Sequence, residues 1–238
     1  MKKKIISVAL VICLIAVATV GTLAYFTDKD SATNTFVSGN VKIDLDENFT
    51  QGSKLLPSTG SAQQGTLQNG VTKEAFVTNT GSEDAYVRVH IAIPAILDSG
   101  DPEFDAGKNV LHFNYDANSI GEGRWDWSNK TGAPYEGQWN YYETTIDGVK
   151  YNVYVVTYEK ALATGETTEN VIHQVYLDGR VTNSDIAKIN EQLGTTWKMY
   201  VAAEGCQAAG FSDAYAALNT AFGTPGAYTV DWTAVTGA

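Results

Sequence analysis

Alternating apolar and polar residues form the dominant pattern along the chain, and this pattern predicts strands. The longest run covers 85–93, where the apolar positions are Ala85, Val87, Val89, Ile91 and Ile93. The intervening positions carry Tyr86, Arg88 and His90 on the opposite face. A period of two is typical of a strand with one face against a core. Similar patterns predict further strands at 41–45, 71–79, 110–115, 139–146, 149–159, 170–177 and 196–204.

Two turn signals lie between predicted strands. Asp147-Gly148 separates the runs at 139–146 and 149–159, and Asp-Gly between two β-prone runs predicts a two-residue hairpin. The sequence TGSED at 80–84 separates the runs at 71–79 and 85–93. We expect a second hairpin turn there.

Helical patterns are few and short. One short helix is expected to be capped within Asn183-Ser184-Asp185 and to run to Leu193, where Gly194 stops it. Another is expected over 211–222, ended by Gly223 and Pro225. Loops rich in Gly, Ser and Asn are expected at 52–70 and 116–138. The second loop carries Trp125 and Trp127, which either pack within the loop or form a shelf for a ligand.

Short alternating strands with sparse helix indicate an all-β fold. We predict an antiparallel β-sandwich of jelly-roll type with a few short peripheral helices, covering 37–238. The two sheets would bury their apolar faces against each other.

The N-terminal segment has the organisation of a secretory signal peptide. Lys2, Lys3 and Lys4 precede an apolar stretch of 16 residues, which is shorter than the roughly 20 residues of a membrane-spanning helix. We predict cleavage between Ala24 and Tyr25, so that 1–24 is removed and the chain contacts a membrane only before cleavage. An uncleaved anchor, or a lipoprotein modified at Cys13, is the alternative.

Charge and cysteine content narrow the range of partners. The net charge is -11, and it becomes -14 after cleavage because three lysines and no acids leave with the signal. Such acidity argues against nucleic acid as a partner, since phosphate binding needs clustered lysine and arginine. Cys206 would be the only cysteine of the exported chain. It cannot form an intramolecular disulfide, and we interpret it as a small buried side chain.

No catalytic motif is found. The three histidines, His90, His112 and His173, lie far apart in strand-like runs and not in a zinc-protease motif. The segment DSGDPEFDAG is a weak candidate for calcium, with carboxylates at Asp98, Asp101, Glu103 and Asp105. A solvated acidic loop is the alternative. We therefore predict no cofactor and no enzymatic activity.

Three segments resemble the TasA/camelysin family of secreted proteins from Gram-positive bacteria. They are GTLAYFTDKDSATNTFVSGNVKIDL at 21–45, VTKEAFVTNTGSEDAYVRVHIAI at 71–93 and WKMYVAAEGCQAAGFSDAYAALNTAFG at 197–223. The first match is the most specific of the three. Residues 98–196 have no counterpart that we can name.

The resemblance implies a structural protein of extracellular biofilm matrix fibres, exported through a SipW-type signal peptidase. In such fibres the processed N-terminus of one subunit is inserted as a strand into the next subunit. Residues 25–36 would be the donor strand, with Tyr25, Phe26 and Phe36 as its anchors. The partner would be a homopolymer at the cell surface or in the matrix, with an accessory assembly protein. Alternatively, 25–36 is the first strand of its own subunit or a disordered tail.

Two other functions remain open on the sequence. Camelysin relatives have been assigned metalloprotease activity, which would make the protein a cell-surface protease. A surface adhesin that binds ligand through Trp125 and Trp127 is the other alternative.

Overall fold

Nine strands form the framework of the part of the chain that the computed structural model describes, namely residues 39–61, 64–98, 109–115, 125–128, 140–226 and 230–236. The strands are β1 (Ile43–Phe49), β2 (Val71–Asn79), β3 (Ala85–Pro94), β4 (Leu111–Tyr115), β5 (Trp125–Asp126), β6 (Tyr141–Ile146), β7 (Val149–Leu162), β8 (Ile172–Leu177) and β9 (Tyr200–Gln207). The helices are α2 (Ala95–Asp98), α3 (Asn183–Leu193), α4 (Ala214–Phe222) and α5 (Trp232–Thr236).

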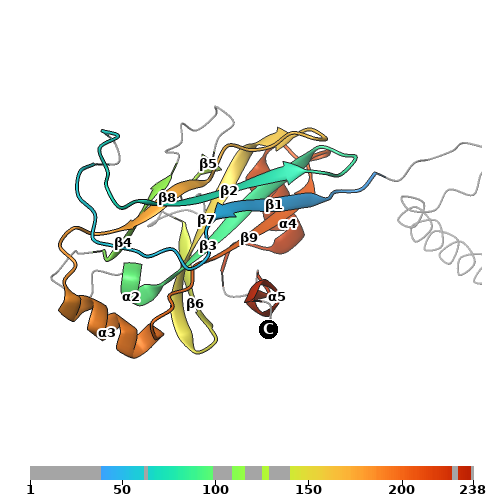
Figure 1. Cartoon of the computed structure of the whole chain (residues 1–238). Coiled ribbons are helices and arrows are strands. Elements are labelled where there is room, and N and C mark those ends of the chain that lie inside the picture. Colours follow the sequence, from blue (N-terminus) through green and yellow to red (C-terminus); the bar gives the residue numbers. More distant parts are fainter. Residues whose placement is uncertain are drawn as a thin grey trace, which may run out of the picture. The chain divides into compact units, whose positions relative to one another are not determined.

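The strands form two antiparallel sheets (Figure 1). The first sheet has the order β1-β2-β8-β4, and the second has the order β5-β7-β3-β9, with β6 also paired to β7. Strand β2 pairs with β8, while its successor β3 pairs with β7, the strand before β8. The successive strands β2 and β3 thus pair with the successive strands β8 and β7, one pair in each sheet. This arrangement is typical of a jelly roll. The predicted all-β sandwich is therefore confirmed.

The core lies between the two sheets. All five apolar positions predicted on one face of β3 are fully buried. Four of them, Val87, Val89, Ile91 and Ile93, pack in one cluster with Ala75 and Val77 of β2 and with Ile172, Val175 and Leu177 of β8. Burying each Val or Ile side chain stabilises the fold by roughly 1.5–3 kcal/mol, so this cluster dominates the cohesion of the sandwich.

The second sheet is also covered on its outer face. Helix α4 lies over it, and a second apolar cluster gathers there, which we call the outer cluster. Its buried members are Ala92, Ile146, Tyr151, Val153, Ala202 and Trp232. This covering explains why Arg88 and His90, which alternate with the core positions of β3, are buried as well.

The predicted hairpin at Asp147-Gly148 is confirmed. Strands β6 and β7 pair directly on either side of it, with Ile146 opposite Val149. The backbone angle φ is 50° at Asp147 and 81° at Gly148. Positive φ at both central residues is the requirement of a type I′ turn, which glycine meets without strain.

The predicted hairpin at 80–84 is wrong, because β2 and β3 belong to different sheets. Strand β2 has β1 on one edge and β8 on the other, so β3 finds its partners elsewhere. The Asn79 side chain holds the loop that crosses from the first sheet to the second. Its Nδ2 donates to the carbonyl oxygens of Glu83 and Leu162, both at 2.8 Å. Its Oδ1 accepts from the amide of Gly81 at 2.9 Å.

Both predicted helices are present, with revised starts. Helix α3 is capped by Thr182, whose side chain and backbone exchange hydrogen bonds with Asp185, and it ends at Gly194 as expected. Helix α4 starts three residues late, because Asp213 caps it. The predicted strand at 196–204 begins only at Tyr200. Helices α2 and α5 were not predicted.

Replacement of Gly148 by alanine tests the hairpin. We expect Gly148→Ala to lower the free energy of unfolding by about 1–2 kcal/mol, because the added Cβ is strained at positive φ. Asp147→Asn, which tolerates the same backbone, should stay within about 0.5 kcal/mol of the parent. Equal losses from both changes in urea unfolding would contradict this description of the turn.

Candidate functional site at the open edge of strand β9

Strand β9 has one unpaired edge. It pairs with β3 along all eight of its residues, and no strand among the described residues pairs with its other side. The backbone N–H and C=O groups on that side are therefore available to another strand.

The edge strand of the first sheet lies beside it. Strand β1 contacts β9, and the side chain of Ile43 lies against Gly205. A Cβ atom at Gly205 would lie only 2.8 Å from Cγ2 of Ile43, so glycine permits this close approach. Both sheets thus end on the same side of the sandwich, which we call the open side.

Apolar side chains along the open side are incompletely covered. Five of them pack against the main core yet remain partly exposed to solvent: Ile43, Leu45, Trp197, Met199 and Ala203. They come from β1, from β9 and from the segment that leads into β9. Partly exposed apolar groups beside an unpaired strand edge are what an added strand would bury.

The charged side chains of β1 and β9 make the free edges of these two strands different. Strand β1 carries three exposed carboxylates, on Asp44, Asp46 and Glu47. The only charged side chain of β9 is Glu204, which is buried. Charged side chains on an edge oppose pairing with another strand, and like charges on neighbouring strands repel. Of the two, the edge of β9 is the better acceptor, especially for an acidic strand.

A buried ionic network fixes β9 to β3. Glu204 lies directly opposite Arg88 in the register and accepts a hydrogen bond from its Nε. His90 Nε2 lies 3.1 Å from the same carboxylate oxygen. Burial alone would raise the pKa of Glu204, but the hydrogen bonds from His90 and Arg88 and the positive charge of Arg88 lower it. The carboxylate is therefore charged at neutral pH.

His90 is held in its neutral form. Burial lowers the pKa of His90 and outweighs the opposing influence of Glu204. A neutral ring that donates from Nε2 to Glu204 leaves Nδ1 as an acceptor. The hydroxyl of Tyr142 lies 3.4 Å from Nδ1 and can donate to it. His90 is thus a buried strand residue paired with Glu204.

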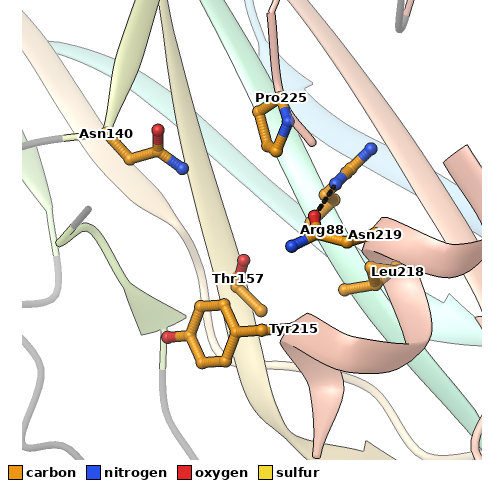
Figure 2. A pocket seen from close by; sticks show the side chains of 7 residues that line it. All are labelled: Arg88, Asn140, Thr157, Tyr215, Leu218, Asn219 and Pro225. Atoms are coloured by element: carbon orange, nitrogen blue, oxygen red, sulfur yellow. Dashed lines mark hydrogen bonds between the residues drawn. The ribbon is translucent and has the colours of Figure 1, made fainter. Parts of the chain in front are cut away.

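Helix α4 is attached to the same network. Arg88 Nη1 donates to Asn219 Oδ1 and to the carbonyl oxygen of Gly223, both at 3.1 Å. Figure 2 shows Arg88 and Asn219 beside a cavity that Tyr215 and Thr157 also line. The cavity measures about 60 Å³, a size and polarity that suit one or two water molecules. We assign these contacts to the support of β3 and β9.

Of the four candidate calcium ligands, Asp98 alone lies within the described residues. Asp98 ends α2 and is buried, so it does not belong to a solvated loop. Its Oδ2 accepts from Asn152 Nδ2 at 2.9 Å and from the Tyr154 hydroxyl at 2.7 Å. Burial raises its pKa despite these bonds. Asp101, Glu103 and Asp105 lie outside the described residues, and within the described part no three metal-binding side chains converge.

The two tryptophans of the 116–138 loop belong to the main core. Trp125 is fully buried and donates from Nε1 to the carbonyl oxygen of Glu169 at 2.8 Å. Trp127 is 6 % exposed and stacks on Phe113 with ring centroids 5.6 Å apart. Both aromatic rings are thus packed, not within the loop itself but against the sandwich. Neither ring forms the exposed shelf on which the adhesin alternative depended.

The other residues singled out in the sequence have ordinary surroundings. His112 pairs with Asp178 at 3.0 Å, and Arg180 helps to lower the pKa of that carboxyl. Cys206 is half-buried on β9, and burial raises the pKa of its thiol. The predicted cleavage residues Ala24 and Tyr25 and the anchors Phe26 and Phe36 lie outside the described residues.

Comparisons with known proteins do not identify the chain. No model of a known protein family matches it, and no curated protein matches it. The resemblance to the TasA/camelysin family therefore stays a prediction. Within the described ranges, no helix is long and apolar enough to span a membrane.

Removal of Arg88 tests the buried network. We expect Arg88→Met to lower the free energy of unfolding by about 3–5 kcal/mol, because it leaves the Glu204 carboxylate buried without its main partner. The control is Lys160→Met, which removes an exposed pair with Glu166 at 3.7 Å and should cost less than about 1 kcal/mol. Similar losses in urea unfolding would show that Arg88 does not stabilise β9 as described.

The network also predicts a pH dependence. Because the pKa of folded His90 lies below its ordinary value of 6.5, the unfolded chain binds a proton first as the pH falls. Stability should therefore be greatest above pH 6.5 and decline as the pH falls below it. Glu204, whose folded pKa is also lowered, should add a further loss below its ordinary value of 4.5. Urea unfolding at pH 7.5, 6 and 5 should show a flatter profile for His90→Gln; an unchanged profile would contradict the assignment.

Proposed function

We propose that this protein is a secreted structural subunit that polymerises head to tail into extracellular fibres. The segment 25–36 of one copy would add as a strand to the open edge of β9 in the next copy. The observation that carries this proposal is the unpaired edge of β9, which has no exposed charged side chain and has partly exposed apolar side chains beside it.

Length and chemistry suit this pairing. The eight residues of β9 extend over about 27 Å, at roughly 3.4 Å per residue. The 12 residues of 25–36 are long enough to pair along the whole strand. Backbone hydrogen bonds would supply a general affinity, and side chains on alternate residues would enter the open side. Each aromatic anchor, if fully buried there, would contribute roughly 1.5–3 kcal/mol.

The path of the chain into β1 favours donation to another subunit. The carbonyl oxygen of Lys42 accepts from the amide of Thr80 at 2.8 Å, and that of Asn40 accepts from the amide of Ser82 at 3.0 Å. Strand β1 begins at the same end of the sandwich at which β9 ends with Gln207. Residues 40–42 continue the direction of β1 beyond that end. A preceding segment would have to reverse its direction to pair with β9 of its own subunit.

Polymerisation follows from the type of contact. Donor segment and acceptor edge are different surfaces, so each subunit can give one contact and receive another. Such a heterologous contact need not close on itself, and it then produces a filament. While 1–24 remain attached, the donor would stay next to the membrane, so cleavage after Ala24 would permit assembly. A SipW-type peptidase and an accessory assembly protein are the partners that the family resemblance implies.

Truncation of the donor tests the proposal. The processed chain, beginning at Tyr25, should form fibres visible by electron microscopy. A chain that begins at Asn40 should keep the same circular dichroism spectrum and thermal transition, because the two sheets and the main core consist of residues after Asn40, yet it should stay monomeric. Phe26→Ser in the processed chain is the full-length control and should weaken assembly without altering the fold. Normal fibres from the truncated chain would refute donation.

A further inference from the structure

The last described segment, 230–236, lies on the outer face of the second sheet next to β9 (Figure 1). Trp232 is 8 % exposed and belongs to the outer cluster together with Ala202 of β9. Its ring centroid lies 6.5 Å from that of Tyr200, the first residue of β9. Helix α5 therefore covers the outer face of the strand whose edge is open.

Helix α5 is anchored mainly through this one side chain. Thr233 and Ala234 are exposed, and the side chain of Val235 is 36 % exposed although it is apolar. Val235 is three residues after Trp232, so the two side chains lie on the same side of the helix. An exposed valine beside a buried tryptophan extends the apolar surface of α5 beyond what β9 itself covers.

A strand added to β9 would meet this surface. It would lie about 4.8 Å from β9, and its side chains would point alternately to the inner and the outer face. On β9, Val201 faces the main core, whereas Tyr200 and Ala202 belong to the outer cluster. The outward side chains of the added strand would therefore stand beside Tyr200 and Ala202, next to α5.

The donor segment begins with two adjacent aromatic residues, Tyr25 and Phe26. In an extended strand, neighbouring side chains point to opposite faces, so only one of the two can enter the apolar open side between the sheets. The other must face outward. An outward aromatic ring gains most from burial if an apolar surface covers it there, and α5 carries such a surface.

We propose that α5 forms the outer half of the acceptor site, where Trp232 and Val235 cover one of the two leading aromatic rings of the neighbouring copy. This inference rests on the proposed function and adds to it a residue-level role for the C-terminal helix. The open side between the sheets would receive the other ring, so that both faces of the donated strand are shielded from water.

The critical concentration for polymerisation of the processed chain tests this role. Trp232→Ala should raise it about tenfold or more, and Val235→Ser should raise it about twofold to threefold. Ala234→Ser, an exposed change on the same helix, is the matched control and should leave it unchanged. Urea unfolding of each variant under monomeric conditions separates loss of assembly from loss of fold. If Trp232→Ala destabilises the monomer, the effect of Val235→Ser on the critical concentration tests the role of α5, because Val235 is exposed.

A double-mutant comparison identifies the ring that α5 covers. Tyr25→Ser and Phe26→Ser are each combined with Val235→Ser. The effect of Val235→Ser should disappear in the background that lacks the outward ring and persist in the other background. Additive effects in both backgrounds would overturn the proposal, as would unchanged or easier polymerisation of Trp232→Ala. Absence of fibres from the parent chain would instead refute the proposed function itself.

Discussion

The hydrogen-bonding requirement of an unpaired sheet edge is the constraint on which this structure depends. Every strand in a sheet offers N–H and C=O groups on both sides, and an edge leaves one row without strand partners. The edge of β1 carries three carboxylates that oppose pairing. The edge of β9 has no exposed charge, and partly exposed apolar side chains lie beside it. Such an edge favours association with a further strand, and our account of function follows from that property.

An acceptor edge must also keep its shape when it is empty. The Arg88–Glu204–His90 network fixes β9 to the central strand β3, and Arg88 extends that support to α4. Buried ion pairs of this kind contribute little net stability compared with apolar packing, but they impose a specific arrangement. We infer that the network holds β9 in one register, so that the open edge is preorganised.

Local pattern predicted most of the elements but few of their partners. Alternation located the strands because it reflects which face of each strand is buried, and Asp147-Gly148 located its hairpin because that turn depends on two residues alone. Pairing depends on distant segments, which explains the wrong hairpin at 80–84. The site itself had no sequence signal: Glu204 is 116 positions from Arg88, and α5 is too short to show a helical period. The proposed donor segment was inferred from family resemblance, not from its periodicity.

Backbone hydrogen exchange at β9, compared between monomer and fibre, tests the central claim most directly. The outward amides of β9 should exchange readily in the monomer and become strongly protected in the fibre, while the amides along the free edge of β1 change little. Protection of β9 in the isolated processed monomer would show that the edge is already filled by its own chain. Fibres in which the β9 amides remain unprotected would equally contradict the account.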